Sequence, residues 1–351
     1  MDKRIEEPFE PFISVIVTVY NQADLIIGCV RSLVNQNYRN YEIIVVDALS
    51  SDGTWELLQN LKRKYKIKNL NLVRKPGNAS AGRNCGIEMA KGEICTFIDS
   101  DASASEDWLN KIVETFNSLE DDDLLVGVGG TSMLPKNSSR KSSVFYHVLS
   151  SSLVHGGRLN PSVQHKRETK GFVGHIPTCN LAIKKSVFSR EGKFDESFDS
   201  GEDLELSTRL RLKGYKLFCS PKIRVAHHQR NSILGFSRQI CGWGKGKGLV
   251  IKKFGLVNKV YLLPLFVLVF AVSLLVLSFS LTHQPFSALI LFLALLCYAV
   301  LVSTESARIA SNNRDKLLFL YGLFLFPLVH LLSTLGLLEG LVKNPEKIGK
   351  R

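Results

Sequence analysis

The sequence predicts an α/β domain with a mostly parallel sheet, followed by a helical C-terminal region that spans a membrane. Two patterns lead to this fold class. Short apolar runs typical of buried strands alternate with segments of helical period over residues 13–98. Three longer runs near the C-terminus carry no charged side chain and are long enough to cross a bilayer. A chain of 351 residues accommodates one large domain or two smaller ones.

The first part of the chain alternates between the two kinds of element. Residues 23–35 have apolar side chains at positions 25, 26, 29, 30, 33 and 34, which lie on one face of a helix. Strands that alternate with helices form a mostly parallel sheet with ligands at the carboxyl ends of its strands, so Asp47 and Asp99 can share one crevice. The expected strands are 13–19, 42–46, 70–74 and 94–98, and the expected helices are 23–35, 54–65 and 80–90.

The three uncharged runs are predicted membrane helices at 260–281, 285–304 and 317–338. Only three residues separate the first two, which should form a helical hairpin. Buried core helices are disfavoured because they would need a very large partner surface. Arg308, Arg314 and Lys316 place the second connection in the cytoplasm. The tail is basic as well, so the third run is either re-entrant or an exception to the positive-inside rule; the tail residues are Lys343, Lys347, Lys350 and Arg351.

Positive charge gathers before the first membrane run. The net charge is +13, and no Asp or Glu occurs between Glu205 and Glu305. A basic cluster beside a membrane is attracted to anionic headgroups by about 1 kcal/mol per residue. Nucleic-acid binding is disfavoured because no recognition motif accompanies the charge. The expected domains are 1–230, a basic interfacial amphipathic segment at 231–259, a transmembrane region at 260–342 and a basic tail at 343–351.

The N-terminus and the cysteines point to the cytosol. Residues 1–11 are polar and charged, which is unlike a signal peptide. The seven cysteines include no Cys-x-x-Cys, which agrees with a reducing compartment and disfavours a disulfide framework or a zinc site.

One acidic motif follows an expected strand. Asp99 and Asp101 come directly after the run 94–98, and residues two apart on an extended segment project to the same side, so both carboxylates can meet one hard cation and, through it, a diphosphate. A second Asp-x-Asp at 121–123 lies in a polar run and is predicted to be a solvated turn. No Gly-x-Gly-x-x-Gly or P-loop motif is present, so a nucleotide held by a metal and acidic groups remains.

Several motifs in order resemble those of the family 2 inverting glycosyltransferases, which have the Rossmann-like GT-A fold. The resemblance covers about residues 12–230, and the part that follows looks like the membrane-bound members that build surface polysaccharides or lipid-linked oligosaccharides. The motifs are the strand 14–19 with Tyr20-Asn21, Ile44-Val45-Val46-Asp47 with Ser51-Asp52-Gly53-Thr54, Gly82-Arg83-Asn84-Cys85-Gly86, Asp99-Ser100-Asp101, Gly192-Lys193-Phe194-Asp195-Glu196 and Gly201-Glu202-Asp203-Leu204-Glu205-Leu206.

The resemblance implies a nucleotide-sugar donor site. Asp47 would contact the base of the donor, Arg83 and Asn84 would lie along the nucleotide, and Asp101 with Asp99 would bind Mn²⁺ or Mg²⁺. Tyr20 and Asn21 join the expected donor site. A strand-end cap for Asp47 and a surface cation for Arg83 are the alternatives. Ala48 stands where family members often have a second acid, so the base is not assigned. His227 or His228 would complete the metal shell or pack beside the following strand.

The same resemblance implies a catalytic base at Glu202-Asp203, which opens the helical stretch 204–213. Asp203 would take the proton from the attacking hydroxyl; a helix cap is the alternative. Because a phosphate needs no base whereas a sugar hydroxyl does, the acceptor is predicted to be a hydroxyl of a lipid-linked saccharide. The basic segment 135–170 is either a mobile loop over the acceptor or a solvated loop. Further acceptor or diphosphate contacts are expected from Arg238, Gln239 and Trp243.

Together these features predict a metal-assisted inverting glycosyltransferase at the cytoplasmic membrane face. One alternative is a polyprenyl-phosphate glycosyltransferase. Another is a processive polysaccharide synthase, although Gln239-Ile240-Cys241-Gly242-Trp243 lacks the arginine of that group's Gln-x-x-Arg-Trp motif. A third is an inactive membrane-anchored binding or scaffold protein, which the retained acids disfavour.

Overall fold

The computed structural model describes residues 10–154, 170–280 and 285–343, and these form two compact units. The first unit holds residues 10–136 and 170–228, and the second holds 137–154 and 229–343. The boundary after residue 228 lies close to the expected one after residue 230. The segment 137–154 belongs to the second unit, which the linear domain division did not anticipate.

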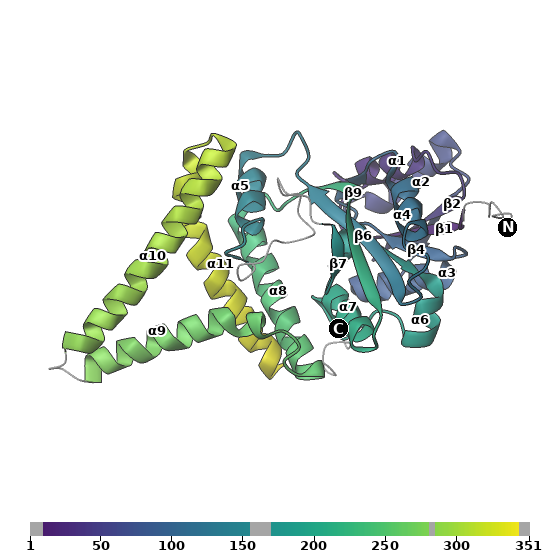
Figure 1. The fold of residues 1–351 in the computed structure, drawn as a ribbon. Coiled ribbons are helices and arrows are strands. Elements are labelled where there is room, and N and C mark those ends of the chain that lie inside the picture. The colour runs from purple at the N-terminus through teal and green to yellow at the C-terminus, as the bar shows by residue number, and fades with distance from the viewer. Residues whose placement is uncertain (1–9, 155–169, 281–284, 344–351) are drawn as a thin grey trace, which may run out of the picture. The chain divides into compact units, whose positions relative to one another are not determined.

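A mixed sheet of nine strands forms the centre of the first unit as far as it is described (Figure 1). The strands β1 (Ile13–Val19), β2 (Tyr41–Asp47), β3 (Leu70–Arg74) and β4 (Ile94–Phe97) are parallel to one another, as predicted. Beyond β4 the order continues through strands that include antiparallel pairs. These strands are β5 (Ala102–Ala104), β6 (Leu125–Met133), β7 (Gly171–Val173), β8 (Leu181–Lys184) and β9 (Lys216–His227).

Helices cover both faces of this sheet. Side chains of α1 (Ile26–Val34), α2 (Thr54–Tyr65) and α4 (Trp108–Asn117) share one apolar cluster with one face of the sheet. The opposite face packs against α3 (Ala79–Met89), α6 (Lys185–Glu191) and α7 (Glu202–Leu212). A short 3-10 turn, η1 (Thr178–Asn180), precedes β8. The four predicted strands and the helices expected at 23–35, 54–65, 80–90 and 204–213 are therefore confirmed to within a few residues.

Two glycines bring α3 unusually close to β1. A Cβ atom on Gly82 would lie 2.8 Å from Thr18 Cγ2, and one on Gly86 would lie 2.5 Å from Ile16 Cγ2. Both glycines face the sheet, because residues four apart lie on one side of a helix. This close packing fixes the positions of Arg83 and Asn84, which stand between the two glycines.

The second Asp-x-Asp copy is a turn, as predicted. Asp121 and Asp123 are exposed in the loop between α4 and β6. Asp122 is half-buried and pairs with Lys216 Nζ at 2.8 Å. This copy lies outside the group of acids described below.

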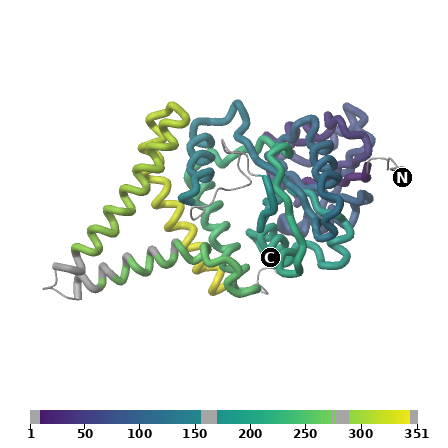
Figure 2. The backbone as a smooth tube through the Cα atoms, in the orientation of Figure 1, coloured from purple at the N-terminus to yellow at the C-terminus, as the bar shows by residue number. Residues whose placement is uncertain are grey.

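The second unit is helical. Figures 1 and 2 show its long helices in green and yellow. These are α8 (Ile233–Phe254), α9 (Leu263–Ser280), α10 (Pro285–Asn313) and α11 (Leu317–Val342). The shorter α5 (Arg140–Leu149) and the 3-10 turn η2 (Lys259–Leu262) belong to the same unit.

The expectation of a loop throughout 135–170 is wrong for residues 140–149, which form α5. Ser139 caps this helix by accepting a hydrogen bond from Ser142 N at 3.2 Å. Val144, Phe145 and Val148 form its buried side, with Phe145 stacked on Phe236 of α8 at 4.3 Å. The basic and serine-rich composition of this segment predicted a loop, because its short apolar face is interrupted by those residues. The rest of the predicted loop at 155–169 lies outside the described residues.

Two of the described helices are long and apolar enough to cross a membrane: Leu289–Asn313 of α10 and Leu317–Val342. They overlap the second and third predicted runs and extend beyond their C-terminal ends. The first predicted run forms η2 and α9, and several side chains of α9 lie outside the described part.

Glycines also join α8 to α11. Gly244 and Gly248 of α8 face Gly336 and Gly340 of α11, and a Cβ atom on any of them would meet the partner helix. Small residues four apart allow two helix backbones to approach closely. The segment 231–259, predicted as amphipathic, therefore has one side buried in protein.

Two glycine substitutions test the packing of α3. Gly86→Ala should lower the free energy of unfolding by about 1–3 kcal/mol, because the methyl group enters the space of Ile16. Gly28→Ala is the matched control, since the exposed Gly28 has no atom within 4 Å of its Cβ position in α1. That change should stabilise by about 0.5–1 kcal/mol through helix propensity. Denaturant unfolding of the detergent-solubilised full chain measures both, and equal effects would contradict the packing.

Candidate active site

The loops after β1 and β2 are tied to each other at the carboxyl edge of the sheet. Asn21, with φ at +50°, donates from its backbone N–H to Ser50 Oγ at 2.9 Å, and its Oδ1 accepts from Ser51 N at 2.9 Å. Asp52 accepts from Ala23 N at 3.0 Å and from Thr54 N at 3.1 Å. These contacts hold the predicted donor loops in one arrangement. Beside them, Tyr20 is 60% exposed and is available to a ligand.

Asp47 lies at the end of β2, fully buried. Its carboxylate pairs with Arg74 Nε at 3.1 Å and accepts from Ser50 N at 3.2 and 3.3 Å. The strand-end contacts of the alternative interpretation are therefore present. The base-binding role of Asp47 stays a prediction, and Arg74 stands beside it as a partner that the sequence did not reveal.

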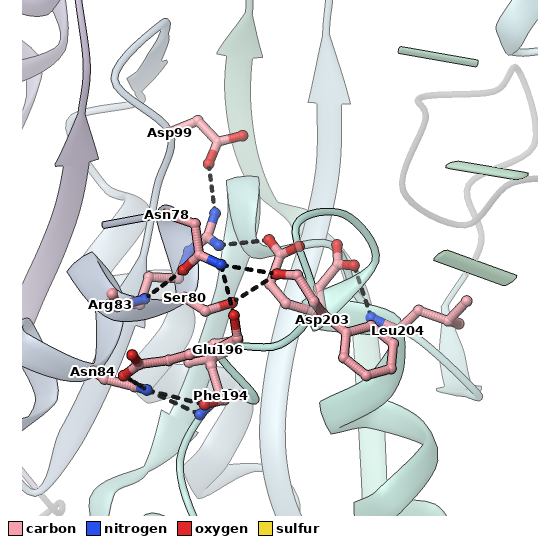
Figure 3. A network of polar contacts seen from close by, with 12 residues as sticks. Asn78, Ser80, Arg83, Asn84, Asp99, Phe194, Glu196, Asp203 and Leu204 are labelled. Atoms are coloured by element: carbon pink, nitrogen blue, oxygen red, sulfur yellow. Dashed lines mark hydrogen bonds and ion pairs between the residues drawn. The ribbon is translucent and has the colours of Figure 1, made fainter. Parts of the chain in front are cut away.

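Arg83 is the centre of a polar network (Figure 3). From the buried side of α3 its Nη1 donates to Glu202 Oε1 at 2.6 Å, and its Nη2 lies 3.4 Å from Asp99 Oδ1. The guanidinium also stands over the Phe194 ring at 5.6 Å. With its side chain only 8% exposed, Arg83 is not a surface cation, so that alternative is wrong. It joins the acid after β4 to the acid that opens α7.

Asn84 and Asn78 fasten the loop that leads to α7 (Figure 3). The Asn84 amide donates to Phe194 O at 2.9 Å and to Glu196 Oε1 at 2.8 Å, and it accepts from Phe194 N at 2.9 Å. Asn78, the N-cap of α3, donates to Glu196 O at 2.8 Å. These bonds give Asn84 a positioning role, and the predicted contact between Asn84 and the donor stays a prediction.

Asp99, Asp101 and His227 meet at the edge of the sheet. His227 Nε2 lies 3.1 Å from Asp101 Oδ1 and 3.8 Å from Asp99 Oδ2. Burial lowers the pKa of His227, but Asp101 outweighs it and holds that pKa well above its usual range. Burial also raises the pKa of Asp99, against the opposing effect of Arg83.

One ligand atom each of Asp99, Cys179 and His227 lies within 4.8 Å of the others, a spacing that suits one metal ion. Oxygen and imidazole ligands suit Mn²⁺ as well as other divalent ions. The three residues predicted as metal ligands are thus brought together, and Cys179 is an addition. His228 donates its backbone N–H to Asp101 O at 3.0 Å.

Glu202 and Asp203 open α7 after Gly201, which takes the left-handed conformation with φ at +79°. Asp203 Oδ1 accepts from Leu204 N at 2.7 Å, and Oδ2 lies 3.4 Å from His175 Nε2. Burial raises the pKa of Asp203, but His175, Arg83 and the Leu204 N–H outweigh it and leave that pKa below its usual value. Asp203 is therefore ionised at neutral pH, which is the state that a base requires.

The sequence did not single out His175 or Cys179. Each is a lone residue without a surrounding pattern, and only the chain path from β7 to η1 brings them to the acids. Arg238, Gln239 and Trp243 lie on α8 of the second unit, so their predicted contact with acceptor or diphosphate stays a prediction.

Replacing Asn84 tests its positioning role. Asn84→Ala should lower the free energy of unfolding by about 2–4 kcal/mol, because it removes three hydrogen bonds and strands the N–H of Phe194. Asn60→Ala, at an exposed position of α2, should change it by less than about 0.5 kcal/mol. Denaturant unfolding compares the two, and a neutral Asn84→Ala would contradict the role.

Known proteins share sequence similarity with much of this chain. The chain is 28% identical over 337 residues to a Dolichyl N-acetyl-alpha-D-glucosaminyl phosphate 3-beta-D-2,3-diacetamido-2,3-dideoxy-beta-D-glucuronosyltransferase of Methanococcus voltae, covering 95% of this chain and 98% of the relative. It is also 28% identical over 222 residues to the glycosyltransferase AglE of Haloferax volcanii, covering 63% of this chain and 68% of that one.

A solved structure shares the fold. The mannosyltransferase PcManGT of Pyrobaculum calidifontis, in complex with GDP-Man and Mn²⁺, superposes with a TM-score of 0.59 at 19% identity, over 95% of this chain and 88% of that one. The predicted α/β fold of GT-A type is therefore confirmed. The model of the family described as Glycosyl transferase family 2 matches residues 14–191, about half of the chain. This chain belongs to glycosyl transferase family 2 and is a glycosyltransferase.

Proposed function

We propose that this glycosyltransferase moves a sugar from a nucleoside-diphosphate sugar to a hydroxyl of a lipid-linked saccharide, with inversion, at the cytoplasmic face of a membrane. The observation that carries the proposal is the Arg83 bridge, which joins the acid after β4 to the acid pair at the start of α7. It brings a metal-type cluster and a candidate base to one side of the sheet.

The donor end would be held by acids and a divalent ion, Mn²⁺ or Mg²⁺. Asp101, Asp99 and His227 are the proposed ligands, and the proximity of their side chains supports this. The ion would stabilise the negative charge that develops on the departing diphosphate. Tyr20, Asn21, Asp47, Arg83 and Asn84 would hold or frame the nucleotide.

Asp203 would be the base. Its ionised carboxylate can accept the proton of an attacking hydroxyl, while Leu204 N and His175 fix its orientation. A general base contributes about 10²–10⁴ in rate. A single displacement at the sugar carbon inverts its configuration. Glu202, paired with Arg83, would keep the start of α7 beside Asp99.

The acceptor proposal follows from the need for a base. A phosphate oxygen is already anionic, whereas a sugar hydroxyl must lose a proton to attack. The name of the Methanococcus relative describes transfer to a dolichyl-linked N-acetylglucosaminyl phosphate, a lipid-linked saccharide. That agreement supports a hydroxyl of such an acceptor for this chain.

The membrane part of the proposal rests on α10 and α11, which are apolar enough to span a bilayer, and on the basic residues of α8. The proposed domains are a cytosolic catalytic domain at 1–230, a basic segment at 231–259, a membrane region at 260–342 and a basic tail. Arg238, Gln239 and Trp243 would face the acceptor or its diphosphate.

Asp203→Asn should abolish transfer and leave donor binding intact, because it removes the proton acceptor but keeps the size and the hydrogen bond from Leu204 N. The measurement is release of nucleoside diphosphate, with isothermal titration of the nucleotide-sugar beside it. The assays use detergent-solubilised enzyme with total membrane lipid. Near-normal turnover in this variant would refute the assignment of Asp203 as base.

The two Asp-x-Asp copies form a matched test of metal binding. Asp101→Asn should weaken Mn²⁺ binding at least about tenfold, because it removes one anionic ligand of the cluster. Asp123→Asn, at the exposed copy, should leave it unchanged. Titration of Mn²⁺ followed by electron paramagnetic resonance in the presence of nucleoside diphosphate reports the free ion. Equal affinities in the two variants would contradict the proposed site.

A further inference from the structure

We infer that α11 does not cross the bilayer but lies along its surface, with one apolar face in the boundary between headgroups and acyl chains. The connection between α10 and α11 and the C-terminus then lie on the same side of the membrane. The inference rests on the membrane association within the proposed function and does not depend on the transfer chemistry. It concerns contacts within the second unit alone.

The helix α8 runs parallel to the second half of α11. Along this stretch Gly244 contacts the turn of Ser333 and Leu337, and Gly248 contacts Leu337 and Gly340. At the end, Lys252 Nζ donates to Lys343 O at 3.0 Å, across 91 positions of sequence. Each residue of α8 therefore lies beside the α11 residue about 91 positions later in the chain.

The helix α5 and the turn after it lie beside the first half of α11. Arg140 Nη2 pairs with both carboxylate oxygens of Asp315 at 2.9 and 3.0 Å, just before α11 begins. The Leu153 carbonyl lies 3.3 Å from His330 Nε2 in the middle of α11. The two polar helices α5 and α8 thus follow α11 from its first turn to its last.

This arrangement would carry charged side chains into the bilayer if α11 crossed it. The 26 residues of α11 measure about 39 Å, more than the hydrocarbon core of about 30 Å, so its centre at Val329 would lie near the midplane if it crossed. By the same offset, the exposed Arg238 of α8 lies beside that centre. Lys245 lies 3.5 Å from Glu339, which stands in the last turn of α11. A crossing α11 would place an exposed arginine at the bilayer centre, where charge is costly.

The helix α11 has one buried side and one exposed apolar side. Its buried side faces protein through Gly322, Val329, Gly336 and Gly340. Its exposed large apolar residues fall at helical spacing on the other side. They include Leu317, Leu320, Phe324, Leu331, Leu335 and Leu338. A bilayer surface fits both features, because acyl chains receive this stripe while anionic headgroups receive the lysines of α8.

The inference also resolves the conflict in the charge pattern. If α11 does not cross, the basic tail after Val342 lies on the same side as Arg308, Arg314 and Lys316, as the positive-inside rule requires. It also places Arg238 and Trp243 of α8 at headgroup level, where the phosphate of a lipid-linked acceptor would lie.

The first experiment brackets α11 in the full-length chain. Ser311→Cys, at an exposed position near the end of α10, and a cysteine appended after Arg351 are treated with membrane-impermeant PEG-maleimide in sealed vesicles of one orientation. The gel shift of the parent chain is subtracted. Before detergent is added, the two sites should behave alike: either both react or both are protected. Reaction at one site with protection of the other would overturn the inference.

A second measurement reports depth directly. A genetically encoded ketone carries a spin label at position 320, 324, 331 or 335 of the reconstituted chain, which leaves the native cysteines unmodified. Oxygen and nickel accessibility should place all four labels at the same shallow depth. A crossing helix would separate 320 from 335 by about 22 Å, which would overturn the inference. Labels shielded from lipid by a second copy of the chain would overturn it too, and a label at exposed Asn60 is the aqueous control.

Discussion

The buried guanidinium of Arg83 is the constraint on which the rest of the site depends. It contacts Glu202 and lies near Asp99, two carboxylates that stand about a hundred positions apart in the sequence. A buried charge is tolerated when it is paired and hydrogen-bonded, and removal of one partner leaves the other uncompensated. The end of β4 and the start of α7 are therefore held together by one side chain of α3.

The position of Arg83 is itself a consequence of packing. Gly82 and Gly86 let α3 approach β1 closely, and Asn84 with Asn78 fastens the loop that delivers α7. The close packing of α3 on β1 thus determines where the Arg83 side chain lies. The position of Arg83 in turn determines which acids its charge reaches. Asp203 stays ionised beside His175, while Asp101 raises the pKa of His227 well above its usual range. These opposite shifts separate a place for a base from a place for an ion.

The sequence predicted elements whose signal is local. The strands β1 to β4 are continuous apolar runs, and the acids at their ends follow directly from the strand boundaries. Three features depended on contacts distant in sequence. His175 and Cys179 reach the acids only through the path of the chain between β7 and β8. The basic and serine residues of α5 obscured its apolar face in the sequence. One side of α8, in the segment predicted as amphipathic, packs on α11 through glycines whose facing partners lie about ninety residues away.

The most direct measurement of the central claim is a double-mutant cycle of Arg83→Met with Glu202→Gln, read by melting temperature and by affinity for nucleoside diphosphate with Mn²⁺. Arg83→Met should lower both, because it strands two acids at the site. Adding Glu202→Gln should recover much of the melting temperature, since it removes the stranded carboxylate, but not the affinity. A single Arg83→Met variant that melts and binds like the parent chain would contradict the account.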